Sequence, residues 1–105
     1  MSEVFKALAD PTRREVLQLL KSGPMSAGEL AGHFEVTKST MSAHFAVLVH
    51  AGLVHAEKHG RSITYQLRMS VLEEALLGFA QAFGLAVTSQ GKERRAGARA
   101  ERGRP

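Results

Sequence analysis

The sequence contains no cysteine in its 105 residues. It therefore forms no disulfide, has no cysteine nucleophile and offers no thiolate ligand to a metal ion. This composition is compatible with a reducing compartment. The fold must rest on buried apolar side chains. A chain of this length buries only a modest core, so a partner subunit could supply some of the burial.

Long apolar runs are also missing. The longest mostly apolar stretch, residues 75–87, is shorter than the roughly 20 residues that span a bilayer as a helix. The N-terminal segment "MSEVFKALAD" is amphipathic and lacks the basic and then apolar order of a signal peptide. We therefore expect a cytoplasmic protein that does not bind a membrane.

Most of the chain has no excess of charge of either sign. The formal net charge is +4, but residues 89–105 hold six Lys and Arg against two acidic residues, so residues 1–88 are neutral. The composition of that last segment, rich in Gly, Ala, Arg and Glu, predicts disorder. We expect one domain at residues 1–88 and a basic disordered tail at residues 89–105. The tail could add non-specific affinity for DNA phosphates.

Helix signals are clear in the first part of the chain. Apolar residues at helical spacing predict a short helix over residues 3–9. Asp10 and Pro11 then start a second helix, because Asp is a favoured N-cap and Pro needs no N–H at the first helical position. We expect that helix to extend to about residue 22.

Two further helices follow in close succession. Ser26 and Glu29 have the spacing of a capping box, which predicts a helix start. This helix ends near Phe34, and Thr37 caps a longer helix that ends before Gly52. A short helix, a turn of about three residues and a longer helix are the layout of a helix-turn-helix.

The period then changes from helix to strand. Residues 62–68 alternate between apolar and polar, and residues 53–58 can pair with them as a first strand. His59–Gly60 fits a tight turn because Gly accepts a positive φ. Helical spacing returns over residues 71–85. We therefore expect a mainly α fold with a small β-hairpin, in the order α-α-α-α-β-β-α. A hairpin directly after a helix-turn-helix is a wing, so the fold class is a winged helix-turn-helix.

The helix capped by Thr37 has an exposed face of small residues, among them Ser39 and Ala43. The B-DNA major groove is about 12 Å wide and only just admits a helix, so small side chains allow close approach to the base edges. The helix N-terminus suits a phosphate, and Lys38 adds positive charge there. We expect DNA contacts from ten residues of this helix and the hairpin: Thr37, Lys38, Ser39, Thr40, Ser42, Ala43, His44, Lys58, His59 and Arg61.

Several of these assignments have a structural alternative. His44 lies beside the apolar stripe and is as well explained as a partly buried structural histidine. The charged hairpin tip, including Lys58 and Arg61, can follow a DNA backbone or enter the minor groove, but charged tips also serve solubility. Arg13 and Arg14 begin the second helix; one could contact phosphate while the other holds local structure.

The last helix carries more apolar surface than one small domain covers, although it could simply close the monomer core. We expect a homodimer through residues of the first and last helices: Val4, Phe5, Leu8, Leu72, Leu76, Phe79, Ala80 and Phe83. Two-fold symmetry would place two reading helices about one DNA turn apart, roughly 34–36 Å. The operator should then be an imperfect inverted repeat.

Three segments carry a resemblance to a known family. They are "FKALADPTRREVLQLL" (5–20), "SAGELAGHFEVTKSTMSAHFAVLVHAGLV" (26–54) and "KHGRSITYQL" (58–67). Over about residues 4–84 the chain resembles the ArsR/SmtB family of winged-helix repressors. The resemblance implies a homodimeric transcriptional repressor of double-stranded DNA, with the first and last helices at the dimer interface. It also implies that the second helix of the helix-turn-helix enters the major groove.

The chain departs from the usual helix-turn-helix layout at Glu35, which occupies a turn position that often carries Gly. It departs from the metal-sensing members of the family in two places, because residues 25–30 contain no Cys and residues 71–84 contain no His. The resemblance is therefore closer to members without metal sites, some of which repress their own operons.

Other functions compete with repression. A Zn- or Ni-responsive repressor would need ligands from the five histidines, His33, His44, His50, His55 and His59, which show no recognised ligand spacing. We therefore expect no metal and no cofactor. A winged-helix protein-interaction module is a further alternative. An enzyme finds little support, since the sequence has no Ser-His-Asp signal and no phosphate-binding loop.

Overall fold

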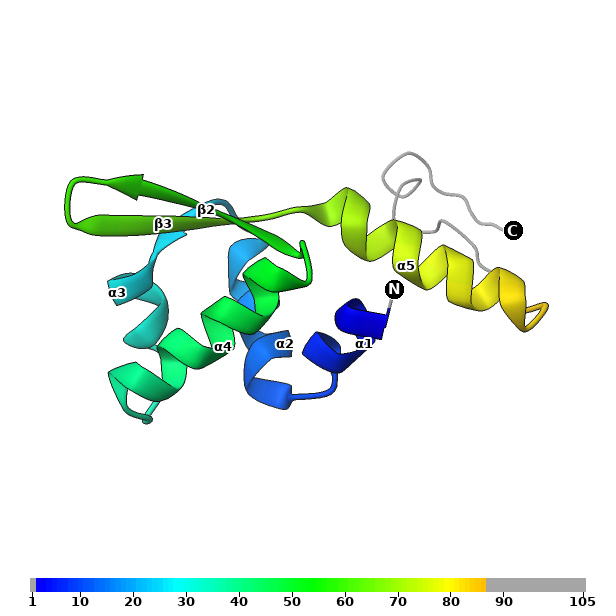
Figure 1. The fold of residues 1–105 in the computed structure, drawn as a ribbon, viewed down its shortest axis with the longest axis horizontal. Helices are drawn as coiled ribbons and strands as arrows, with labels where there is room; N and C mark the ends of the chain where they lie inside the picture. Colours follow the sequence, from blue (N-terminus) through cyan, green and yellow to red (C-terminus); the bar gives the residue numbers. More distant parts are fainter. Residues whose placement is uncertain (1, 87–105) are drawn as a thin grey trace. The chain divides into compact units, whose positions relative to one another are not determined.

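The computed structural model describes residues 2–86, so the expected tail at 89–105 lies outside the described residues. In chain order the elements are α1 (Ser2–Leu8), α2 (Pro11–Leu20), β1 (Met25–Ser26), α3 (Ala27–Ala31), α4 (Lys38–His50), β2 (Val54–His59), β3 (Ser62–Leu67) and α5 (Met69–Ala82) (Figure 1). The predicted winged helix-turn-helix is confirmed, with one additional strand. The chain divides after Ala75 into two units.

The predicted helix starts are formed by side-chain caps. The Ser26 hydroxyl accepts the Glu29 N–H at 3.1 Å, and the Glu29 carboxylate accepts the Ser26 N–H at 2.9 Å. At α4 the Thr37 hydroxyl accepts the Thr40 N–H at 3.1 Å. Each cap satisfies an amide that a helix start otherwise leaves without a partner, which stabilises the helix by about 1 kcal/mol.

The end of α4 is also fixed by local chemistry. Gly52 adopts a φ of +79°, and its N–H donates to the Val49 carbonyl at 2.9 Å. The next N–H, that of Leu53, donates to the Leu48 carbonyl at 3.0 Å. This Schellman pattern closes the helix, and the apolar pair Leu48 and Leu53 is fully buried beside it.

The helix before α4 is shorter than the sequence predicts. It ends at Ala31 and not near Phe34, because two glycines, Gly28 and Gly32, leave it with weak helix propensity. The connection to α4 therefore spans residues 32–37 and is longer than the expected turn of about three residues.

The sheet contains a strand that the sequence does not reveal. Its order is β1-β3-β2, and all neighbours are antiparallel. In β1, Met25 pairs with Tyr65, and a two-residue strand is too short to show an alternating pattern. His59 pairs with Ser62, so the tight turn consists of Gly60 and Arg61 and not of His59 and Gly60. Gly60 has a φ of +62°, as a tight turn requires.

One apolar core lies in the first unit. The rings of Phe45 and Tyr65 pack with centroids 4.7 Å apart, which joins α4 to the sheet, and burial raises the pKa of the Tyr65 phenol. Burying each large apolar side chain stabilises the fold by about 1.5–3 kcal/mol. The buried members of this core are Val4, Ala7, Val16, Leu17, Leu20, Leu30, Met41, Phe45, Leu48, Leu53, Val54, Tyr65 and Ala75.

Candidate nucleic-acid interface

Helix α4 separates a buried face from an exposed one. Met41, Phe45 and Leu48 are at most 4% exposed and hold the helix against the core. The face expected to meet DNA is exposed at Thr37, Lys38, Ser39, Thr40, Ser42 and Ala43. These side chains are open to solvent within the first unit, so a narrow surface of mostly small residues is available to a groove.

Hydroxyl groups gather at the start of α4. The Thr37 hydroxyl donates to the Thr40 hydroxyl at 2.9 Å and lies 3.3 Å from that of Ser39. Thr37 is therefore occupied as the N-cap. Because Thr40 accepts this bond, its own proton can point outward as a donor. The Ser42 hydroxyl has no protein partner in the described part of the chain, which leaves it available to a base or a phosphate.

Arg13 connects three helices through one guanidinium group. Its Nε donates to the Ala7 carbonyl at 2.8 Å and one terminal nitrogen donates to the Lys6 carbonyl at 3.0 Å, both at the end of α1. Its other terminal nitrogen lies 3.2 Å from Nδ1 of His44 in α4. A guanidinium only donates, so Nδ1 must accept, and the proton of the neutral imidazole lies on Nε2.

The same region contains the charged N-cap of α2. Loss of hydration raises the pKa of the Asp10 carboxyl, but hydrogen bonds from the N–H groups of Arg13 and Thr12 lower it. The positive charge of Arg13 lowers it too, and the net pKa lies below its ordinary value. Asp10, Arg13 and His44 thus form a linked polar group between α1, α2 and α4.

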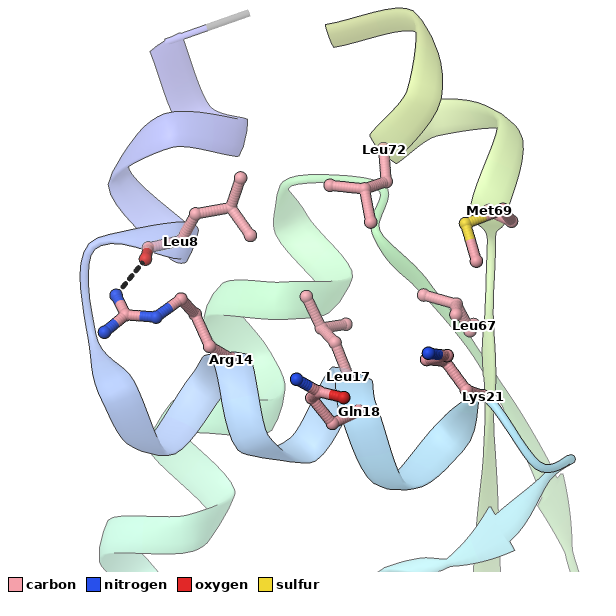
Figure 2. Close-up of a pocket in the computed structure, with 8 residues that line it drawn as sticks. All are labelled: Leu8, Arg14, Leu17, Gln18, Lys21, Leu67, Met69 and Leu72. Carbon is pink, nitrogen blue, oxygen red and sulfur yellow. Dashed lines mark hydrogen bonds between the residues drawn. The ribbon is translucent and has the colours of Figure 1, made fainter. Parts of the chain in front are cut away.

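Arg14 also has a local partner. Its guanidinium donates to the Leu8 carbonyl at 2.7 Å, as the dashed line in Figure 2 shows. The sequence suggested that one of Arg13 and Arg14 contacts phosphate and the other holds local structure. In the structure both hydrogen-bond the carbonyl end of α1, where a helix leaves acceptors without intrahelical donors.

The hairpin tip presents the predicted cations. Lys58, His59 and Arg61 are all exposed, and Arg61 belongs to the turn itself. Glu57 was not among the residues predicted to act here, and its carboxylate lies 3.9 Å from Nε2 of His59. The two side chains share a strand face because they are two residues apart, a period that the sequence already contained.

The histidines were the potential metal ligands that the sequence offered. Among residues 2–86, no group of three or more His, Cys, Asp or Glu side chains is placed to hold a metal ion. The same residues contain no helix that is both long and apolar enough to cross a membrane.

The residues expected at a dimer interface fall into two sets. In the first unit Val4 is buried in the core of its own chain, while Phe5, Leu8 and Leu72 are half-buried. Val4 therefore stabilises the protomer and has little surface left for a partner.

The second set lies on the later turns of α5. Leu76, Phe79 and Phe83 are 47%, 46% and 67% exposed, and the two phenyl rings lie 4.9 Å apart. Ala80 is 6% exposed, so it too offers little surface to a partner. Leu77, which was not among the residues expected at the interface, is 44% exposed on the same helix.

Comparison with known proteins gives consistent matches. A family model of a helix-turn-helix domain matches residues 8–57. The transcriptional repressor SdpR of Bacillus subtilis (strain 168) is 42% identical over 76 residues, which is 72% of this chain and 84% of that protein. The arsenical resistance operon repressor of Staphylococcus xylosus is 38% identical over 73 residues, 70% of each chain. A crystal structure of an ArsR family transcriptional regulator has a TM-score of 0.70 at 34% identity, covering 83% of this chain and 92% of its own.

Proposed function

The chain belongs to the ArsR/SmtB family of winged-helix transcriptional repressors, and from this premise we propose that it acts as a homodimer on an inverted-repeat operator. It is a DNA-binding protein and not an enzyme. Repression would follow from occupying the operator and blocking the polymerase. The family and the absence of a membrane-spanning helix among residues 2–86 support action on DNA in the cytoplasm.

The observation that carries the proposal is the two-sided character of α4. Met41 and Phe45 anchor its buried face in the core, while its exposed face carries small and hydroxyl-bearing residues. In the major groove, Ser39 and Ser42 can donate to or accept from base edges, and the Ala43 methyl can contact a thymine methyl. Lys38 at the helix start lies where a phosphate would offset its unfavourable position at the positive end of the helix dipole.

His44 has a defined role in this proposal. With Nδ1 accepting from Arg13, its Nε2–H is the group left to donate to a phosphate oxygen. Arg13 is then a positioning residue, because it fixes the tautomer and the ring orientation of His44 without needing to touch DNA. This role unites the two readings of His44 that the sequence left open.

The hairpin supplies a second contact on the same DNA. Arg61 at the turn and Lys58 on β2 would follow the backbone or enter a narrow minor groove, where arginine is favoured. The Glu57 carboxylate beside His59 weakens the local positive potential, so His59 contributes less than Arg61. The basic segment at 89–105 would add a non-specific, salt-dependent affinity.

The exposed apolar face of α5 supports the dimer. Leu76, Phe79 and Phe83 together expose a continuous set of large side chains of the kind that subunit interfaces bury. A two-fold dimer would align two copies of α4 with successive turns of one DNA face, roughly 34–36 Å apart. A half-site operator would then bind much more weakly than the full repeat.

The direct test is footprinting on the DNA upstream of the protein's own gene, followed by titration of the protected sequence. We expect protection of an imperfect inverted repeat, unchanged by Zn²⁺ or Ni²⁺. Affinity should fall steeply between low and moderate salt, since phosphate contacts release counterions. A salt-independent affinity, or protection that requires metal, would count against the proposal.

A further inference from the structure

A second site lies away from the expected DNA surface, within residues 1–75. It is a hollow of about 340 Å³ between the end of α1, the helix α2, the end of β3 and the start of α5 (Figure 2). This volume is within the range of small-molecule sites. Its lining residues are Leu8, Arg14, Leu17, Gln18, Lys21, Leu67, Met69 and Leu72.

The lining combines an apolar interior with a polar rim of one charge sign. Five of the eight residues are apolar, and none is acidic. The three polar residues, Arg14, Gln18 and Lys21, are spaced at i, i+4 and i+7 and so lie along one face of α2. Arg14 is held in place by the Leu8 carbonyl at 2.7 Å, which uses one of its five N–H groups and leaves the others available.

Three further hollows among the described residues have a different character. One beside Glu15 and one beside Glu3 each include a carboxylate, which would repel an anion. A third, lined by Lys38 and Met41, has a smaller volume of about 190 Å³ and a single cation. The hollow in Figure 2 combines two cations with five apolar lining residues and no carboxylate.

We propose that this hollow binds an amphipathic monocarboxylate of medium chain length, and that occupancy changes operator affinity. The carboxylate would lie between Arg14 and Lys21, with Gln18 as a further donor, and the apolar body would cover Leu17 and Leu67. It would be an effector site in a repressor whose described residues include no group of three or more potential metal ligands.

The change in operator affinity rests on the proposed function. A ligand carboxylate that binds the remaining N–H groups of Arg14 would draw the guanidinium toward the hollow and strain its bond to the Leu8 carbonyl, and Leu8 and Leu72 are also expected dimer-interface residues. Its binding would therefore loosen the end of α1 that Arg13 ties to His44.

Methionine methyl groups give a direct test of binding. Met69 lines this hollow, whereas Met41 lines the smaller hollow under α4 and Met25 belongs to β1. Titrating decanoate, below its micelle concentration, into full-length protein with ¹³C-labelled methionine methyls should shift the Met69 signal saturably. Met25 and Met41 should stay in place. Assignment follows from Met69→Leu.

Charge is tested with one neutral ligand and a matched pair of variants. Decanol, which has the same chain without the charge, should bind at least about fivefold more weakly. Lys21→Met should weaken decanoate binding about fivefold, since it keeps the apolar stem and removes the cation. Lys6→Met removes another exposed lysine, from α1, that does not line this hollow, and should leave the affinity unchanged.

The outcomes separate the possible occupants. No saturable Met69 shift, equal shifts at Met41, or equal affinities for decanoate and decanol overturn the site. A Met69 signal that responds to protein dilution and not to decanoate shows that a second copy fills the hollow, which also overturns it. Operator binding is measured first without ligand, so a failure of DNA binding is recognised on its own. An unchanged operator affinity in the presence of bound decanoate rejects the effector role.

Discussion

Two helices of this chain expose opposite kinds of surface. On α4 the exposed residues are small and polar, and Ser39, Ser42 and Ala43 are typical of them. On α5 they are large and apolar, with Leu76, Phe79 and Phe83 between 46% and 67% exposed. Each surface is unusual for a solvated helix, which normally exposes charged residues on its outer face.

The difference indicates two kinds of partner. A nucleic-acid groove is narrow and polar, so the helix that enters it must be thin and able to form hydrogen bonds. A protein interface gains free energy from burying apolar area, roughly 25 cal/mol per Å², so large side chains are favoured there. Mutations that change the small polar surface of α4 or the apolar surface of α5 one at a time test this difference.

The largest effect is expected from Ser42→Glu. It places a bulky negative charge on the DNA-facing side of α4, so operator affinity should fall at least about a hundredfold, because like charges repel and the helix is held away from the bases. Fluorescence anisotropy with the labelled operator measures the loss. Ser22→Glu, an exposed serine after α2, is the matched control and should bind normally. Full affinity in Ser42→Glu would remove α4 from the DNA interface.

Phe79→Glu should break the apolar surface of α5. The charge cannot be buried against a partner without a large cost, so the protein should sediment as a monomer and bind the operator about ten- to hundredfold more weakly. Gln81→Glu, exposed on the same helix, is the control and should remain dimeric. An unchanged sedimentation mass for Phe79→Glu contradicts the proposed interface.

Arg13→Gln should have an intermediate effect. Operator affinity should fall about fivefold in Arg13→Gln and by a similar factor in His44→Gln. The double variant should lose little more affinity than either single variant, because the two residues act as one unit. Nitrogen NMR of His44 distinguishes positioning from general destabilisation. The wild type should show the Nε2–H tautomer, and Arg13→Gln should show a mixture. Independent, multiplicative losses in the double variant would reject the positioning role.

The smallest effect is expected from Arg61→Gln at the hairpin turn. Removing one phosphate contact should lower affinity about two- to fivefold and reduce the slope of log affinity against log salt by about one. Affinities measured from 50 to 300 mM salt give the slope. Gln66→Asn, exposed on β3 away from the turn, should leave the slope unchanged. An unaltered slope in Arg61→Gln places the turn away from DNA.

Local signals in the sequence predicted much of this fold. Capping by Asp10, Ser26 and Thr37 and closure at Gly52 depend on neighbours within five residues, and the structure confirms each of them. Such features involve short-range hydrogen bonds whose partners are set by spacing alone.

What the sequence could not predict depends on distant contacts. Strand β1 exists because Met25 pairs with Tyr65, and no local sequence pattern predicts a two-residue strand. The bond from Arg13 to His44 joins residues far apart in the chain, so it could not be read from spacing. Whether Val4 faces the core or a partner likewise depends on how α1 packs, and helical period alone does not decide it.

The short strand β1 has a consequence for how the molecule opens. Ser26 pairs with Thr64 in the sheet and also caps α3, so a single residue fastens the wing to the first helix of the helix-turn-helix. Breaking one attachment exposes the other, which makes the two elements a cooperative unit. The amide hydrogens of α3 and those that join β1 to β3 should therefore exchange with solvent through a common opening event, although one set belongs to a helix and the other to a sheet.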